Sequence, residues 1–288
     1  MICAQKRKDG GLQMKTVEEL KQIANDVRID IIRQVSRAQS GHPGGSLGCT
    51  DILTVLYFNV MDITPENAVS IDRDRFVLSK GHASPALYAI LAAKGIIPHE
   101  ELKTFRQLDS RLQGHPNMNM VPGVDMSTGS LGQGLSAANG MALANRLDGN
   151  DHRIYCLMGD GEVEEGQIWE AAMAAHHYKL DNLCGIVDVN NLQIDGTTDH
   201  VIGPNPIGPK FAAFGWNVIE IDGHDYNEIQ NAFAEAKTVK GVPTVIIANT
   251  VKGKGVSFME NNVDWHGKAP SGDLIKTALN DLGAQEEE

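Results

Sequence analysis

Two short motifs bring together the residue types that bind a hard cation and a phosphate. Asp160 lies in GDGEVEEG, which spans residues 159–166, and Asn190 begins an Asn-Asn pair after the next apolar run. The oxygens of Asp160 and Asn190 could share one divalent cation, and the glycines would let backbone N–H groups approach phosphate oxygens. Each motif is also a common way to turn a chain or to end a strand. The pair predicts a diphosphate and metal site at one edge of a sheet.

Four histidines lie in glycine-containing loops at the ends of elements. They are His42 in GHPGG, His82 in GHAS, His115 in GHPN and His266 in WHGK. An ordinary hydrogen-bonded loop histidine is the commoner interpretation of any one of them. Together they predict a polar pocket suited to proton transfer and to binding sugar hydroxyls, because loops at one edge of a parallel sheet converge. Zinc is the competing ligand, but no pair has the short spacing of common zinc sites.

The elements around GDG and Asn-Asn place both motifs at strand ends. Residues 153–159 and 182–189 are apolar and β-prone, and residues 167–179 between them have helical spacing. These segments form about one strand–helix–strand unit. We therefore expect Asp160 and Asn190 at the carboxyl ends of neighbouring strands, where open parallel sheets bind ligands.

The rest of the chain alternates helices and strands in the same way. Helices are expected at 17–38, 50–61, 84–95, 99–108, 135–147, 225–240 and 272–282, further strands at 74–79, 217–222 and 243–252, a glycine-rich loop at 39–48, and an irregular segment at 113–134. The helix at 225–240 opens with a capping-box pattern formed by Asp225 and Glu228. This alternation predicts an α/β fold, a doubly wound parallel sheet with helices on both faces.

Composition sets the broad class of the protein. The 288 residues carry a net charge of -12 and 42% apolar residues, with no internal repeat and no shift that marks a second large domain. We expect one domain at 15–283, a flexible tail at 1–14 and an acidic tail at 284–288. The basic N-terminus has no apolar run behind it, so we expect a cytoplasmic protein without a signal peptide or membrane span. The negative charge argues against nucleic acid as the main partner.

The cysteines do not indicate disulfides or zinc. Cys3, Cys49, Cys156 and Cys184 form neither a C-x-x-C pair nor a zinc spacing, and the last two fall inside expected strands. We therefore expect small, buried, reduced side chains.

The motifs resemble a known family when they are taken in order. GDG followed by Asn-Asn resembles the thiamine diphosphate-binding motif, and SGHPGGSLG, DRFVLSKGHASPALYA, GHPNMNMVPGVDMSTGSLGQGLSAANGMA and DGHD appear in the order found in transketolases. The resemblance extends from about Val17 to Gly272. It implies the thiamine diphosphate-binding fold.

The resemblance also implies a role for each site residue. Asp160, Asn190 and the main-chain carbonyl of Leu192 would bind Mg²⁺, which Ca²⁺ or Mn²⁺ often replace, and Gly161 would face the diphosphate. The segment TGSLGQG, in which Ser130 replaces a family proline, would lie along the cofactor through Gly129, Ser130 and Leu131. Among the histidines, His82 and His266 would contact the cofactor, and His42 and His266 would flank the reacting carbon. His115 would bind the donor's terminal hydroxyls. Glu165 and Glu170 would lie near a subunit contact.

Two of these segments keep an alternative interpretation. Glu165 could be a helix-start carboxylate stabilised by the helix dipole. The small residues of 135–147 could serve internal helix packing instead of a subunit interface.

The resemblance implies an N-terminal subunit of a split transketolase, which moves a two-carbon ketol group from a ketose phosphate to an aldose phosphate. Full-length transketolases add a pyrimidine-binding domain with the glutamate that activates the cofactor. We expect a C-terminal partner subunit to supply that domain, in a two-plus-two heterotetramer. Alternatives are a 1-deoxyxylulose-5-phosphate synthase or another ketol transferase, because GGSLG departs from the family's GAPMG. A non-catalytic cofactor-binding module and a fragment of a longer protein also stay open.

Overall fold

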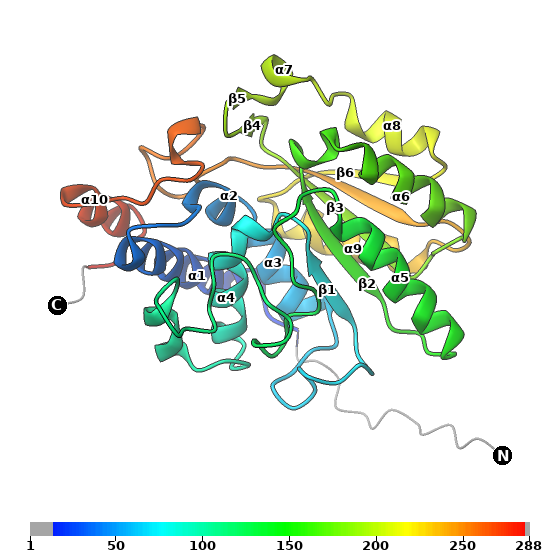
Figure 1. Ribbon diagram of the computed structural model, residues 1–288, viewed down its shortest axis with the longest axis horizontal. Helices are drawn as coiled ribbons and strands as arrows, with labels where there is room; N and C mark the ends of the chain where they lie inside the picture. Colours follow the sequence, from blue (N-terminus) through cyan, green and yellow to red (C-terminus); the bar gives the residue numbers. More distant parts are fainter. Residues whose placement is uncertain (1–13, 286–288) are drawn as a thin grey trace.

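The computed structural model describes residues 14–285 and is built on a five-stranded parallel sheet (Figure 1). Its strands, in spatial order, are β1 (Arg75–Leu78), β2 (Ile154–Gly159), β3 (Leu183–Val189), β7 (Thr244–Asn249) and β6 (Asn217–Asp222). Every neighbouring pair is parallel. The prediction of a doubly wound parallel sheet is confirmed.

Helices cover both faces of this sheet (Figure 1). They are α1 (Val17–Ala38), α2 (Pro43–Gly48), α3 (Thr50–Val55), α4 (Ser84–Ala93), α5 (Gly134–Leu147), α6 (Gly166–His177), α7 (Thr198–Val201), α8 (Ile207–Ala213), α9 (Tyr226–Thr238) and α10 (Asp273–Asp281). Alternate strand residues point to opposite faces, so each strand serves two cores. Tyr155 and Leu157 of β2 pack with α1, α3, α4 and α9, whereas Cys156 and Met158 pack with α5, α6 and α8.

Local capping signals fix where the long helices begin. Thr16 and Glu19 form a complete capping box at the start of α1. Asp225 caps α9 by accepting from the backbone N–H groups of Asn227 and Glu228. The predicted capping box at α9 is wrong in one detail, because the Glu228 side chain accepts from the Asp222 N–H.

Several predicted element types need correction. The expected glycine-rich loop at 39–48 contains the buried helix α2, with Pro43 at its first position, where proline is favoured. The expected helix at 50–61 is α3 followed by a π-helical turn at Leu56–Val60, and the helix expected at 99–108 is a 3-10 segment at His99–Thr104. A two-stranded hairpin of β4 (Leu192–Gln193) and β5 (Gly196–Thr197) was not predicted, and neither were α7 and α8.

Some expectations fall at the margins of the described chain. Residues 1–13 and 286–288 lie outside it, so the two predicted tails stay predictions. Cys49, Cys156 and Cys184 are buried free thiols, in agreement with the sequence. Within residues 14–285, no helix is both long and apolar enough to cross a bilayer.

Candidate active site

A cavity of about 350 Å³ opens at the carboxyl ends of β1, β2, β3 and β7. It is lined by nearly all the residues that the sequence singled out, namely His42, His82, His115, Gly129, Leu131, Asp160, Gly161, Glu165, Asn190, Leu192 and His266. The exceptions are Ser130 and Glu170, which are exposed and are not part of the lining. The structure thus gathers segments from most of the chain into one pocket.

Asp160 occupies the first position after β2 and is held by backbone donors. One carboxylate oxygen accepts from Gly161 N at 2.9 Å, and the other accepts from Asn190 N at 2.9 Å and Asn191 N at 2.5 Å. Burial and the nearby Asp188 carboxylate raise the Asp160 pKa to about 6. The carboxylate therefore ties β2 to the end of β3 before it meets any ligand.

Three oxygens at this end of the cavity match the donors that Mg²⁺ prefers. Besides Asp160, they are Asn190 Oδ1, which accepts from Leu192 N at 3.2 Å, and the carbonyl of Leu192, which accepts from Lys252 Nζ at 2.8 Å. Carboxylate, amide and carbonyl oxygens each carry more than one lone pair, so these contacts leave room for a cation. Among the described residues, no cluster of three or more His, Cys, Asp and Glu side chains could hold a metal.

A buried ion pair lies directly behind these oxygens. Lys80 Nζ contacts Asp188 Oδ2 at 2.5 Å, and the two side chains are 2% and 0% exposed. Lys80 also donates to Gly45 O at 3.1 Å, and Asn190 Nδ2 donates to Asp188 at 3.2 Å. A carboxylate can only accept, so this contact fixes the amide of Asn190 with Nδ2 toward Asp188. The pair joins the ends of β1 and β3 to α2.

A second buried carboxylate, Glu162, holds the segment 129–134 in place. It accepts from Gly132 N and Gly159 N, both at 3.0 Å, and from the hydroxyl of Ser79. Burial raises its pKa despite these donors. Glu162 therefore positions the segment that the resemblance assigns to the cofactor.

Close backbone packing explains two glycines at the cavity wall. A Cβ at Gly81 would lie 2.5 Å from Thr128 Oγ1 and 2.8 Å from Gly129 N. Gly129 has φ of +140°, which side-chain-bearing residues rarely adopt, and its position packs against the His115 ring. The His82 turn can approach Thr128 and Gly129 because Gly81 lacks a side chain, and Gly129 can lie against His115 because it lacks one too.

Three imidazoles pack against one another on the other side of the cavity. The ring centroids of His42 and His82 are 5.2 Å apart, those of His42 and His266 5.6 Å, and those of His82 and His266 5.2 Å. Burial, aided by nearby positive charge, lowers the His42 pKa to about 4, the His266 pKa to about 3, and the His82 pKa well below its usual value. All three rings are therefore neutral at pH 7.

Two of these rings have a nitrogen whose hydrogen-bonding capacity is not satisfied. Among the described residues, Nδ1 of His42 and Nδ1 of His266 are buried without a hydrogen-bond partner. An unsatisfied buried polar atom costs free energy, and such atoms are often explained by an unbound ligand or water. The fourth histidine, His115, lies at the same cavity with a pKa lowered by burial and by Arg106.

Sequence reasoning missed several charged groups of the site. Lys80, Glu162, Asp188 and Lys252 were not predicted, although all four are buried at the cavity or directly behind it. Burial and Lys80 lower the Lys252 pKa to about 8. Two signals in the sequence were available: Asp188 lies inside an otherwise apolar strand, and Lys80 and Lys252 each come shortly after a strand. Buried charges are rare without a partner, so these residues indicate charge pairing inside the fold.

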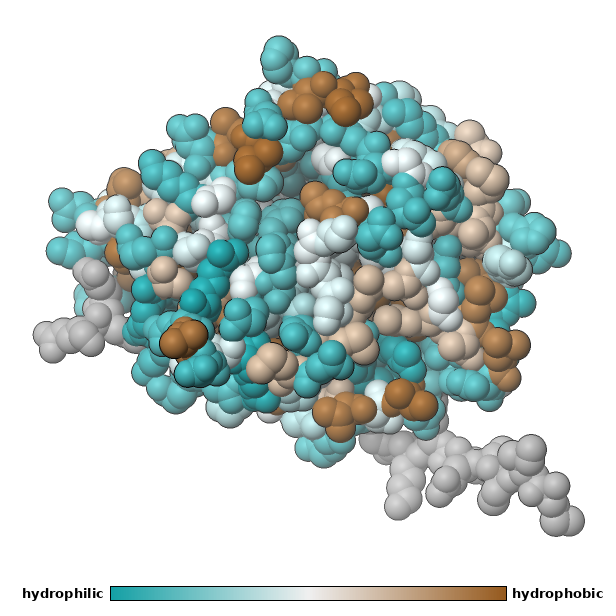
Figure 2. Space-filling view, viewed as in Figure 1, coloured by the Kyte–Doolittle hydropathy of each residue, from teal (hydrophilic) through white to brown (hydrophobic). Residues whose placement is uncertain are grey.

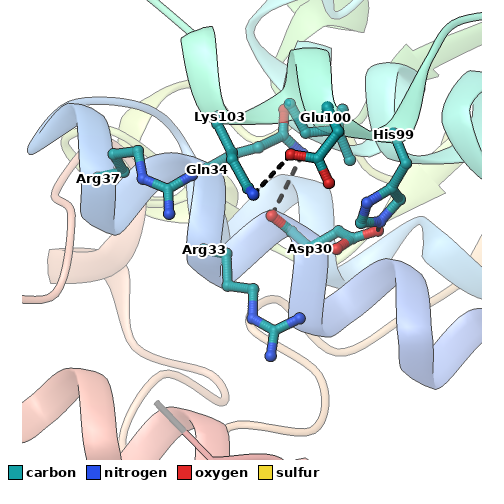
Figure 3. Close-up of a pocket in the computed structure, with 8 residues that line it drawn as sticks. Asp30, Arg33, Gln34, Arg37, His99, Glu100 and Lys103 are labelled. Carbon is teal, nitrogen blue, oxygen red and sulfur yellow. Dashed lines mark hydrogen bonds and ion pairs between the residues drawn. The ribbon is translucent and has the colours of Figure 1, made fainter. Parts of the chain in front are cut away.

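A second hollow, between α1 and His99–Thr104, differs from this cavity (Figure 3). Its volume is only about 60 Å³, and no predicted site residue lines it. Its charges pair with one another, His99 with Asp30 at 2.8 Å and Lys103 with Glu100 at 2.6 Å. Such pairing is typical of a surface ion-pair cluster, so the cavity at the sheet edge is the candidate active site.

The fold and the cavity define a class of cofactor-binding protein. Open parallel sheets bind ligands at strand carboxyl ends, and here that edge carries oxygen ligands on one side and neutral imidazoles on the other. The family model described as "Transketolase, thiamine diphosphate binding domain" matches residues 19–288. The chain belongs to this transketolase family, and its domain is one that binds thiamine diphosphate.

The chain matches two curated relatives over nearly their whole length. It is 46% identical over 264 residues to the 6-deoxy-6-sulfo-D-fructose transketolase subunit of Clostridium sp. (strain MSTE9), covering 92% of this chain and 96% of the relative. It is 43% identical over 266 residues to an apulose-4-phosphate transketolase subunit of Phocaeicola vulgatus, covering 92% and 94%. Both relatives are named as subunits.

Solved structures give the same fold inside longer chains. Transketolase from Campylobacter jejuni superposes with a TM-score of 0.87 at 39% identity, covering 94% of this chain but 44% of that one. A Pichia stipitis transketolase structure superposes with a TM-score of 0.89 at 34% identity, covering 41% of that chain. This chain therefore spans less than half the length of these transketolases.

Proposed function

We propose that this chain is the N-terminal subunit of a transketolase that moves a two-carbon ketol unit from a ketose phosphate to an aldose phosphate. The observation that carries the proposal is the cavity, which joins the oxygens of Asp160, Asn190 and Leu192 to the cluster of His42, His82 and His266. A module that only binds the cofactor needs the oxygen ligands but has no use for neutral proton-transfer groups beside them.

The cofactor is thiamine diphosphate held with Mg²⁺. Asp160, Asn190 and the Leu192 carbonyl hold the metal, and the backbone at Gly161 together with the Lys252 ammonium faces the diphosphate. When bound, the cofactor supplies an electron sink for breaking and forming carbon–carbon bonds. Calcium or manganese can replace magnesium at such oxygen sites.

The histidines handle protons and hydroxyls of the sugar. His42 and His266 are neutral and line the cavity, so each can accept a proton from a substrate hydroxyl. His82 faces the cofactor from a fully packed position, and His115 binds the donor's terminal hydroxyls. Glu165, exposed at the cavity rim, contacts the partner.

The partner is a C-terminal subunit that carries the pyrimidine-binding domain. The lengths support this, because the chain covers 96% of a relative named as a subunit but 44% of a full transketolase. The face of α5 and α6 offers a docking surface: Gly140, Ala144 and Leu147 are exposed on α5, and Met173 on α6. Pale and brown surface spreads over these helices in the space-filling view (Figure 2). We propose a two-plus-two heterotetramer, the arrangement that places each cofactor between subunits.

Reconstitution tests the proposal directly. The purified chain is assayed with thiamine diphosphate, Mg²⁺, xylulose 5-phosphate and ribose 5-phosphate, and the candidate partner is then titrated in. We expect activity only with the partner, saturating at one partner per chain. The substrates named for the two relatives, 6-deoxy-6-sulfo-D-fructose and apulose 4-phosphate, are included as donors. Activity of the chain alone contradicts the split arrangement, and failure with every donor contradicts the catalytic assignment.

A further inference from the structure

Arg106 combines an unusual backbone with an unusual environment. It has φ of 57°, in the left-handed region that residues with side chains seldom occupy. Its backbone N–H donates to Leu112 O at 2.9 Å, which closes the turn that leads to Gly114 and His115. A strained residue persists only where its surroundings require it, so the position of this side chain needs an explanation.

The guanidinium lies between two loops that each carry a site histidine. Its Nη1 donates to Ser40 Oγ at 3.0 Å, and Ser40 is two residues before His42. A Cβ at Gly114, the residue before His115, would lie 2.5 Å from Arg106 Cζ and 2.6 Å from Nε. The guanidinium is therefore seated directly on the Gly114 backbone and touches the His42 loop at the same time.

Arg106 has no carboxylate partner within the described part of the chain. Among residues 14–285, no carboxylate lies within 4.0 Å of its nitrogens, and its Nε is buried without a hydrogen-bond partner. Burial is the main cause of the lowered pKa of His42 and of His115, and the positive charge of Arg106 lowers both further. The other charged or titratable groups near His42 are His82, His115, Lys252 and His266.

We infer that Arg106 is a positioning residue of the active site: through Ser40 and Gly114 it holds the His42 and His115 loops in fixed relation to each other and keeps a positive charge beside both rings. The inference rests on the proposed function for the roles of the two histidines. Its consequence is that donor binding depends on a residue that is not part of the cavity lining.

Three variants separate the charge of Arg106 from its geometry. Arg106→Met removes the charge and the hydrogen bond, and Arg106→Lys keeps the charge but loses the planar fork. Gly114→Ala keeps the arginine and pushes its guanidinium aside, because the new methyl group would overlap Cζ. The control is Arg111→Met, which removes an arginine of the same segment that pairs with Glu101.

Histidine titration by NMR on the full chain is the first measurement, and it needs neither partner nor activity. Signals are assigned with His42→Gln and His115→Gln. We expect Arg106→Met to raise the midpoints of both histidines and Arg111→Met to leave them unchanged. Arg106→Lys should stay nearer the parent than Arg106→Met does. If Arg106→Met folds and leaves both midpoints in place, the inference is overturned whatever the activity of the complex.

Kinetics of the reconstituted enzyme is the second measurement. We expect Arg106→Met and Gly114→Ala to raise the donor KM roughly three- to tenfold, the size of losing one hydrogen-bonded contact, with a smaller effect on kcat. In Arg106→Met, the acidic limb of the pH–rate profile should move to higher pH, because the histidine midpoints rise. A purely structural role predicts a lower melting temperature with unchanged KM and pH profile in the folded variants, and that result also overturns the inference.

Discussion

The two sides of the cavity differ in how completely the chain satisfies its own polar groups. On the side proposed to bind the metal, called the metal side, Asp160 accepts hydrogen bonds from three backbone N–H groups. Behind it, Asp188 accepts hydrogen bonds from Lys80, Asn190 and Thr250. On the histidine side, the Nδ1 atoms of His42 and His266 have no partner in the described chain. The chain itself thus satisfies the polar groups on the first side, whereas it leaves these two imidazole nitrogens on the second side unpaired.

This difference matches the demands of the two tasks. A site for a diphosphate and a metal must be rigid, because loosely held ligands lose affinity. A proton-transfer group must stay neutral near pH 7, and burial beside other imidazoles achieves this at the cost of an unsatisfied atom. Mutations on the metal side should therefore change cofactor affinity or stability, whereas mutations on the histidine side should change turnover.

The largest effect is expected on the histidine side. His42→Ala and His266→Ala should lower kcat by roughly 10²- to 10⁴-fold, the usual contribution of a positioned proton-transfer group, while cofactor affinity stays near the parent value. Rates, cofactor binding and melting temperature are measured on one preparation of the reconstituted complex. His99→Ala, an exposed histidine at the second hollow, is the control. Normal turnover in a folded variant would remove that histidine from the mechanism.

Asp160→Ala should give the next largest effect and should act on binding. We expect Mg²⁺-dependent affinity for thiamine diphosphate to fall on the order of 100-fold or more, above the 10–100-fold typical of residues that only support a ligand. Affinity is measured by titration of the complex. Asp195→Ala, at an exposed turn between β4 and β5, is the matched control. Equal affinity in both variants would falsify the metal assignment.

The buried ion pair offers a test that depends on stability. Lys80→Met leaves the Asp188 carboxylate buried without its cation and should reduce the free energy of unfolding by about 3–5 kcal/mol. The double variant Lys80→Met with Asp188→Leu removes both charges and should recover part of that loss. Denaturant unfolding of the chain measures both. A double variant less stable than the single one would show that the pair contributes more than mutual neutralisation.

The smallest effect concerns pH. His42 and His266 have native pKa values of about 4 and about 3, below the ordinary value of 6.5. Below about pH 6.5, these imidazoles become protonated in the unfolded chain but stay neutral in the native one. They therefore lower the free energy of unfolding as the pH decreases. His42→Gln should weaken that dependence between pH 6.5 and 4, as measured by melting temperature against pH. An unchanged slope would mean that His42 binds protons equally well in the native and unfolded chains.

The positions of Asp160 and Asn190 were predictable from sequence, whereas the supporting charges were not. Asp160 and Asn190 directly follow apolar strands, so parallel-sheet geometry brings them together. Glu162 and Asp188 lie in the same motifs, but their partners Ser79, Gly132 and Lys80 are distant in sequence and carry no periodic signal. Their pairing exists only in the folded chain.

At helix α2, by contrast, the sequence favoured a loop, which is the wrong local structure. Three glycines and a proline within Pro43–Gly48 give low helix propensity, yet every residue of this helix is buried. Tertiary packing decides here, since Gly44 and Gly48 lie against the backbone of Trp265 and Val251. The small residues are needed for that approach.

The distance along the chain between His42 and His266 also governs when the site can form. Their rings lie 5.6 Å apart, but most of the described chain separates them in sequence. During synthesis, Asp160 and Asn190 emerge well before His266, but β7, which pairs with β3, and Lys252, which donates to Leu192 O, emerge only shortly before it. Contacts between such distant residues form late and slowly. Both sides of the cavity are therefore completed only when nearly all of the described chain has been synthesised.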